Sequence, residues 1–199
     1  MKIVLLVVSL FMISFATLAQ TEEPKPMVSD DPLTSEQIAV YRAFLQGYNN
    51  GSGSTLNLAN VTDIWGDPSL DVKQGQGCLK GIHLENIKLA KSTVHRTDAL
   101  ASANLIIVDP AKQNEQVRRN DPSTALREGS KTVDDAVKDA FSSGLLTLSE
   151  IAFTKDHQWA VMSFSFHCGM LCGHGSVIVL HKNQGVWKIT KRNCGGWIA

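Results

Sequence analysis

The residues of this chain most suited to chemistry are four cysteines and the histidines beside two of them. Cys168 and Cys172 are separated by three residues and flanked by His167 and His174. Thiolate sulfur and imidazole nitrogen are ligands that zinc and copper(I) accept, so a metal site at these four residues is one interpretation. We favour structural disulfides, because the C-x3-C spacing is a weaker metal signature than paired CxxC motifs. We therefore expect no cofactor and no metal.

The four cysteines allow three connectivities, of which two fit the predicted strands. One joins Cys168 to Cys172 and Cys78 to Cys194; the other joins Cys172 to Cys194 and Cys78 to Cys168. The predicted pairing of the last two strands places Cys194 opposite about position 173, at the same end of the sheet as Cys168. We favour the first connectivity, because the glycines beside Cys168 and Cys172 permit a tight ring. The second stays open.

The beginning of the chain has the features of an export signal. Lys2 precedes an apolar run from Ile3 to Phe15, and small residues follow up to Ala19. We expect residues 1–19 to be a signal peptide that is removed, which places the mature protein in the periplasm or outside the cell. The apolar run is shorter than the ~20 residues of a membrane-spanning helix, so we expect no membrane anchor after cleavage. Export in turn favours oxidation of the cysteines.

Charge and composition narrow the classes of partner. Lys plus Arg and Asp plus Glu each number 19, so no overall positive field attracts nucleic acid. Residues 20–32 are rich in proline and acid, which predicts a disordered leader. Residues 33–199 have the size and apolar content of one domain, and we expect a monomer.

Amphipathic segments predict three helices. The first occupies residues 34–47 and opens on a capping box of Thr34 and Gln37. Asp121-Pro122 opens a second, short helix, because proline suits the first helical position. The third runs over residues 132–144. Its predicted apolar face consists of Val133, Val137 and Phe141.

The C-terminal quarter predicts an antiparallel sheet. Runs 159–168, 176–181 and 186–192 are rich in β-forming residues and separated by turns, and 151–154 is a candidate fourth strand. Apolar and polar residues alternate along these strands, so we expect one face of the sheet to pack on the core and the other to be polar and solvated. The fold class is therefore α+β, a C-terminal antiparallel meander of three to four strands packed by amphipathic helices and stabilised by disulfides. The polar face holds Ser163, Ser165, His167, Lys188, Thr190 and Arg192.

The C-terminal region also resembles a group of uncharacterised exported bacterial proteins. The segments that carry the resemblance are His167-Cys-Gly-Met-Leu-Cys-Gly-His-Gly175, Gly185-Val-Trp-Lys-Ile189 and Gly196-Trp-Ile198. In that group a CGxLCGxG turn precedes a WK strand and a terminal WIS-like tripeptide; here Ala199 stands where serine is expected. The resemblance implies a bacterial exported protein and no particular activity.

These observations favour a non-catalytic binding or inhibitory module that presents the turn 168–174 to a protein or a cell-envelope ligand. The alternative is a cell-envelope hydrolase that uses His83, His95 or His167 as a base. The sequence contains no G-x-S-x-G, metalloprotease or phosphate-loop motif, so the enzyme alternative has less support. The candidate binding residues are Met170, Leu171, His174, Lys188 and Arg192.

Overall fold

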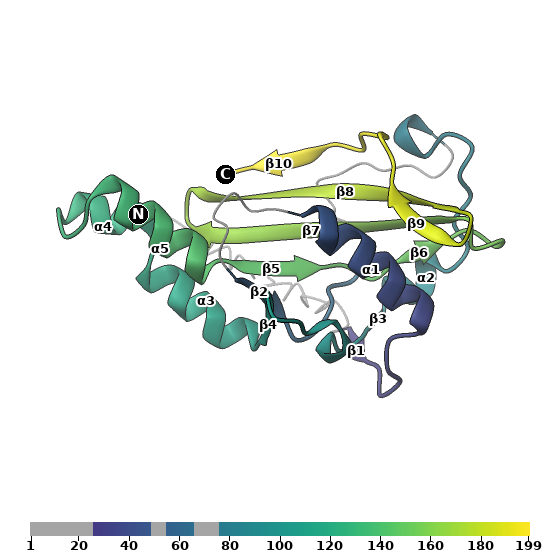
Figure 1. Ribbon diagram of the computed structural model, residues 1–199, viewed down its shortest axis with the longest axis horizontal. Coiled ribbons are helices and arrows are strands. Elements are labelled where there is room, and N and C mark those ends of the chain that lie inside the picture. The colour runs from purple at the N-terminus through teal and green to yellow at the C-terminus, as the bar shows by residue number, and fades with distance from the viewer. Residues whose placement is uncertain (1–25, 49–54, 66–75) are drawn as a thin grey trace, which may run out of the picture.

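The computed structural model describes residues 26–48, 55–65 and 76–199, which form helices around one large mixed sheet (Figure 1). Across these residues the strand order of the sheet is β10-β8-β7-β5-β2-β4, with β6 paired to β7 and β9 to β8. The arrangement confirms the predicted α+β class. The strands are β2 (Leu56–Ala59), β4 (Leu105–Val108), β5 (Leu145–Leu148), β6 (Ala152–Phe153), β7 (Trp159–Gly169), β8 (Cys172–Asn183), β9 (Val186–Ile189) and β10 (Gly196–Ile198).

The sheet is wider than the predicted meander because it includes parallel strands. β2 pairs in parallel with both β4 and β5, whereas β5, β7 and β8 pair antiparallel. A separate short ladder joins β1 (Met27–Val28) to β3 (Thr93–Val94). The described fold thus includes residues of the predicted leader, because Met27 and Ser29 donate backbone hydrogen bonds to Ser92 and Val94.

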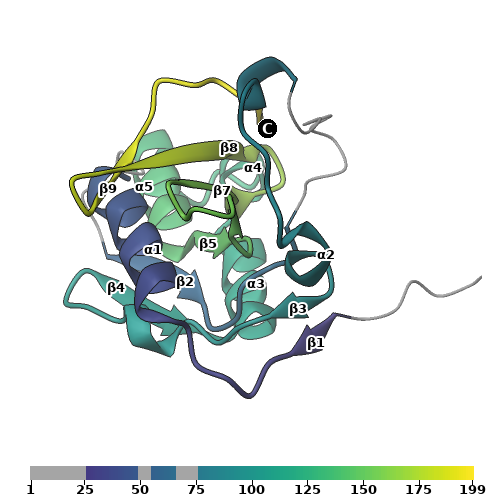
Figure 2. The same cartoon turned by 90° about the vertical axis from the view of Figure 1, so that its right-hand side faces the viewer.

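Helices α1 (Ser35–Gly47) and α5 (Val133–Ser143) cover one face of the sheet. The predicted capping box of Thr34 and Gln37 opens α1. Tyr41 and Phe44 of α1 pack with Leu146 and Phe166 in the largest core cluster. Figure 2 shows α1 beside this face and the segment that contains α2 (Ile87–Ala90) on the opposite side of the sheet.

The second face of the sheet is not the solvated surface that the alternation predicts. Val161, Val177 and Val179 on this face are buried against Leu79 and Ile82, which come from the segment around Cys78. The prediction was wrong here because a segment that contains only short helical turns, Gly77–Leu79 and α2, covers the strands. Turns this short give no periodic signal in the sequence.

Two helical predictions also need correction. On α5, Val133 and Val137 are 60% and 41% exposed, whereas Phe141 packs against the main core cluster as predicted. The buried positions are Ala136, Ala140 and Ser143. Small side chains let the helix approach the sheet closely. Helix α3 (Pro110–Arg119) was not predicted from the sequence; Asp109 opens it by accepting hydrogen bonds from two backbone N–H groups of its first turn. α4 (Pro122–Arg127) begins at Asp121-Pro122 as predicted.

The disulfides join Cys78 to Cys194 and Cys168 to Cys172, which is the favoured connectivity. Cys194 does not lie opposite position 173, because the chain leaves the sheet edge after β9 and returns only at β10, where Gly196 pairs with Ser176. The intervening loop carries Cys194 to Cys78. No helix in the described part of the chain is long and apolar enough to cross a membrane.

Candidate functional site

The candidate site is the closed end of the β7–β8 hairpin, residues 168–172, which we call the hairpin tip. The disulfide between Cys168 and Cys172 holds their Cα atoms 5.0 Å apart. Cys168 is buried in the main core cluster, so the ring is anchored to the interior of the protein. Met170 and Leu171 at the apex are 78% and 75% exposed. Two large apolar side chains are therefore presented to solvent on a cross-linked turn.

Asp121 fixes the hairpin tip to the start of α4. Its Oδ2 accepts a hydrogen bond of 2.5 Å from the backbone N–H of Met170, and its Oδ1 caps α4 through the N–H of Ser123 at 2.9 Å. Burial works to raise the pKa of Asp121, but the hydrogen bonds from Ser123, Met170 and Thr124 outweigh it and lower the pKa. A Cβ on Gly169 would lie 2.9 Å from Pro122 Cδ, so the turn packs directly on the helix start.

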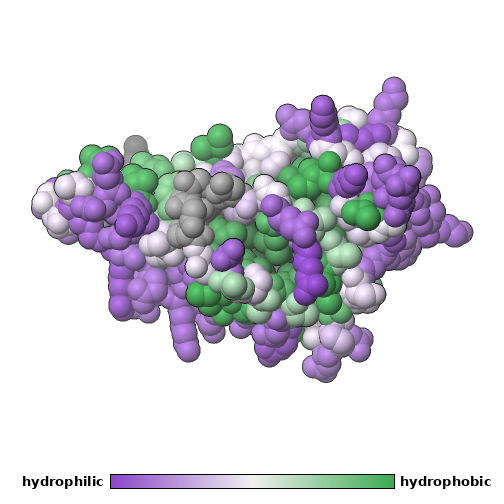
Figure 3. Space-filling model, in the orientation of Figure 1, coloured by the Kyte–Doolittle hydropathy of each residue, from purple (hydrophilic) through white to green (hydrophobic). Residues whose placement is uncertain are grey.

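The C-terminal strand β10 lies at the same end of the sheet (Figure 1). Ile198 pairs with His174 and is 91% exposed. The indole of Trp197 folds over β8, because a Cβ on Gly175 would lie 2.5 Å from Trp197 Nε1. Figure 3 shows apolar patches among hydrophilic residues at this end of the molecule. Ile198 therefore adds a further exposed apolar side chain near the hairpin tip.

The other predicted binding residues do not join this surface. His174 is half-buried, with Nε2 3.3 Å from the Tyr48 hydroxyl, and burial lowers the pKa of His174. Lys188 is exposed on β9, opposite His181. The guanidinium of Arg192 donates to the carbonyl oxygens of Cys78 and Lys80 at 2.8 and 2.9 Å. Arg192 is thus engaged by the loop around Cys78 and does not form an anion site with Lys188 at the hairpin tip.

The alternative metal site at His167, Cys168, Cys172 and His174 does not fit the arrangement. Both cysteines are joined in the disulfide, so neither supplies a thiolate. His167 and His174 lie at successive pairing positions and point to opposite faces of the sheet. The ring of His167 lies against Trp197, with centroids 4.9 Å apart. Within the described ranges, no group of three or more His, Cys, Asp or Glu side chains is arranged to hold a metal ion.

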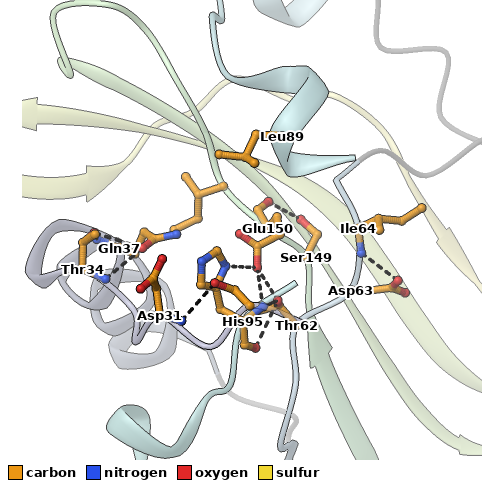
Figure 4. A network of polar contacts seen from close by, with 12 residues as sticks. Asp31, Thr34, Gln37, Thr62, Asp63, Ile64, Leu89, His95, Ser149 and Glu150 are labelled. Atoms are coloured by element: carbon orange, nitrogen blue, oxygen red, sulfur yellow. Dashed lines mark hydrogen bonds and ion pairs between the residues drawn. The ribbon is translucent and has the colours of Figure 1, made fainter. Parts of the chain in front are cut away.

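One of the three candidate catalytic histidines lies beside a carboxylate in a buried polar network. His95 Nδ1 is 3.0 Å from Glu150 Oε1, which also accepts hydrogen bonds from the backbone N–H of His95 and the hydroxyl of Thr62. In Figure 4 these three side chains point toward one another. Glu150 is 3% exposed, and the neighbouring Tyr41 has its pKa raised by burial and by the Glu150 charge. The network joins the ends of β3 and β5.

Asp121, Thr62 and Glu150 were not predicted from the sequence as parts of these sites. Asp121 carried a recognisable signal as a helix cap, but its bond to the hairpin tip spans 49 residues. Glu150 and Thr62 are 88 residues apart, and nothing local in the sequence pairs them. No family model, curated protein or solved structure matches this chain.

Proposed function

We propose that this protein is an exported, non-catalytic binding or inhibitory module that inserts the hairpin tip into an apolar pocket of a partner protein. The observation that carries the proposal is the exposure of Met170 and Leu171, 78% and 75%, on a turn that a disulfide closes. Exposed large apolar side chains on a constrained turn are typical of contact surfaces. The two disulfides are compatible with an oxidising compartment.

Preorganisation is the physical reason for this choice. A flexible loop loses conformational freedom when it binds, and that loss reduces affinity. Here the ring between Cys168 and Cys172, the hydrogen bond from Met170 to Asp121 and the packing of Gly169 on Pro122 already restrict the turn. The backbone of the turn therefore loses little conformational entropy on binding. Burial of the two apolar side chains then contributes more fully to the affinity.

The proposal is tested by affinity purification from the envelope fraction of the source cells. Met170→Ala with Leu171→Ala removes the apolar apex and should lower partner recovery at least tenfold. Val186→Ala is the control, because Val186 is an apolar residue, 58% exposed, on β9 beside the end of β8 that lies opposite the hairpin tip. Equal recovery of every partner by the double variant and the wild type would contradict the proposal.

The second candidate function is a cell-envelope hydrolase with His95 as the base. The observation that favours it is the contact between His95 Nδ1 and Glu150, which orients the ring as a carboxylate does in catalytic dyads. Wild-type protein should then release soluble fragments from dye-labelled peptidoglycan, and His95→Gln should reduce the rate about a hundredfold. No release by the wild type, or equal release by a folded His95→Gln variant, excludes this candidate.

A further inference from the structure

Strand β10 is an edge of the large sheet. It is the outermost strand in the order β10-β8-β7-β5-β2-β4 and forms the upper margin of the sheet in Figure 1. Gly196 and Ile198 of this strand are exposed, Ile198 by 91%. An edge strand presents a row of N–H and C=O groups with which another extended chain can pair.

The register of β10 shows which of its backbone groups face outward. The Gly195 carbonyl and the Ala199 N–H make hydrogen bonds to β8. Because hydrogen-bonded and non-hydrogen-bonded positions alternate in an antiparallel pair, Trp197 between them also bonds to β8. The N–H and C=O groups of Gly196 and Ile198 therefore point away from β8, and no residue in the described part of the chain pairs with them.

The sequence of this edge does not protect it from pairing. Edge strands of natural proteins are often protected by charged side chains, by proline or by a covering segment. Residues 194–199, CGGWIA, contain no charged side chain and no proline. The opposite edge strand, β4, differs, because Leu105 and Ser102 exchange backbone hydrogen bonds of 3.1 and 3.2 Å that close part of it. Of the two edges, β10 is therefore better suited to accept a strand.

Two features hold β10 in place before a partner arrives. Cys194, immediately before the strand, is bonded to Cys78. In the middle of the strand, the Trp197 indole lies over Gly175 and against His167, with ring centroids 4.9 Å apart. An incoming strand thus meets a backbone that is already ordered, which lowers the entropic cost of pairing.

We propose that β10 accepts an extended segment of the partner protein as an additional, antiparallel strand of the sheet. This inference rests on the proposed function, because the same partner would hold the hairpin tip in its pocket. Gly196 and Ile198 would each exchange N–H and C=O hydrogen bonds with one residue of the segment. Side chains of the segment would pack beside Ile198 on one face and beside Trp197 on the other, which favours β-branched or aromatic residues.

A partner protein fits this edge better than a second copy of the chain. β10 has three residues, so pairing of two β10 strands buries much less than the ~1,200 Å² of a stable interface. A partner that also takes the hairpin tip gains a second contact. The hairpin tip is close enough, because β10 pairs with the part of β8 that directly follows the tip, from His174 to Ser176.

The test is an NMR titration of the full, disulfide-bonded chain with a capped hexapeptide of alternating threonine and valine. The amide resonances of Gly196 and Ile198 should shift at millimolar peptide. Ile198→Pro removes the outward N–H and leaves the hydrogen bonds to β8 in place, so it should weaken peptide binding about tenfold or more. Ile198→Ala is the matched control, because it loses the side chain and keeps the N–H, and should weaken binding less than about fivefold.

A second probe tests the same hydrogen bonds without altering the protein. The hexapeptide N-methylated at every residue has no N–H to donate, so it should not bind to the wild type. Ile198→Pro should unfold at the wild-type temperature, because the side chain of Ile198 is 91% exposed and its N–H points away from β8.

Four results would overturn the proposal. They are no shift at Gly196 and Ile198 in millimolar peptide, equal weakening by Ile198→Pro and Ile198→Ala, equal binding of the N-methylated peptide, and a dimer of the free chain that Ile198→Pro abolishes. The dimer would assign the edge to a second copy. The hairpin tip is unchanged in these proteins and the peptide has no pocket for it, so failure here leaves the proposed function untouched.

Discussion

Single acidic residues connect distant parts of this protein. Asp121 closes the first turn of α4 and also holds the hairpin tip, and Glu150 joins Thr62 to His95. Each carboxylate accepts several hydrogen bonds in a buried position, where an unpaired donor is costly. Their removal should therefore affect stability more than removal of any exposed acidic residue.

Glu150→Ala should lower the free energy of unfolding by about 3 kcal/mol, because it leaves the donors of His95 and Thr62 buried without an acceptor. Glu150→Gln retains an acceptor oxygen and should cost less. Urea denaturation measures both, with Glu128→Ala on exposed surface as the control, expected within about 0.5 kcal/mol of the wild type. A Glu150→Ala variant as stable as this control would show that the hydrogen-bond network of Glu150 does not stabilise the fold.

Asp121 should make stability depend on pH in the acid range. Its pKa in the folded protein is lowered from the ordinary 3.8, so its contribution is present above about pH 4 and is lost as the pH falls through the folded value. Thermal unfolding between pH 5 and pH 2.5 should show a steeper loss for the wild type than for Asp121→Asn. If the unfolding temperatures of the two proteins fell in parallel with pH, Asp121 would not be the group that makes stability depend on pH.

Secondary-structure elements show how far the sequence alone determines the architecture. The capping box at Thr34 and the Asp121-Pro122 start were predicted, because these signals depend on adjacent residues. The same Asp-Pro dipeptide at Asp109 follows the end of β4 and begins α3, but its helix-start signal was not recognised and α3 was missed. The parallel strands depend on long-range pairing that local patterns do not encode.

The tight ring at the hairpin tip was also predictable, because its signal depends on residues that are close in the sequence. Cys168, Met170, Leu171 and Cys172 are adjacent in the sequence, so the tight ring could be favoured before its geometry was known. The anchor at Asp121 and the role of Arg192 arise from contacts across 49 and 114 residues. Tertiary structure decides those contacts, and a single sequence holds no signal for them.

The two disulfides should differ in their contribution to stability. Cys78 and Cys194 are 116 residues apart, and Cys168 and Cys172 are four apart. In the chain-entropy model these loops correspond to about 5 and about 2 kcal/mol of stabilisation. Replacement of each pair by serine, followed by urea denaturation, should reproduce the order. Equal losses would show that the Cys168–Cys172 ring contributes by packing as well as by chain entropy.

The whole molecule places its two proposed surfaces at the same end of the sheet. The hairpin tip joins β7 to β8, and β10 pairs with the part of β8 that directly follows the tip, from His174 to Ser176. Helices α1 and α5 on one face and the segment around Cys78 on the other hold the hairpin between them. One partner protein can therefore contact the hairpin tip and β10 together.

Site-specific photo-crosslinking in the source cells tests whether the hairpin tip contacts a partner protein. A photoreactive residue in place of Leu171 should give one discrete adduct, identifiable by mass spectrometry and competed by excess unlabelled protein. The same residue in place of Val186, which is 58% exposed on β9 beside the far end of β8, should give none. No adduct at position 171, or the same adduct at both positions, would contradict the account.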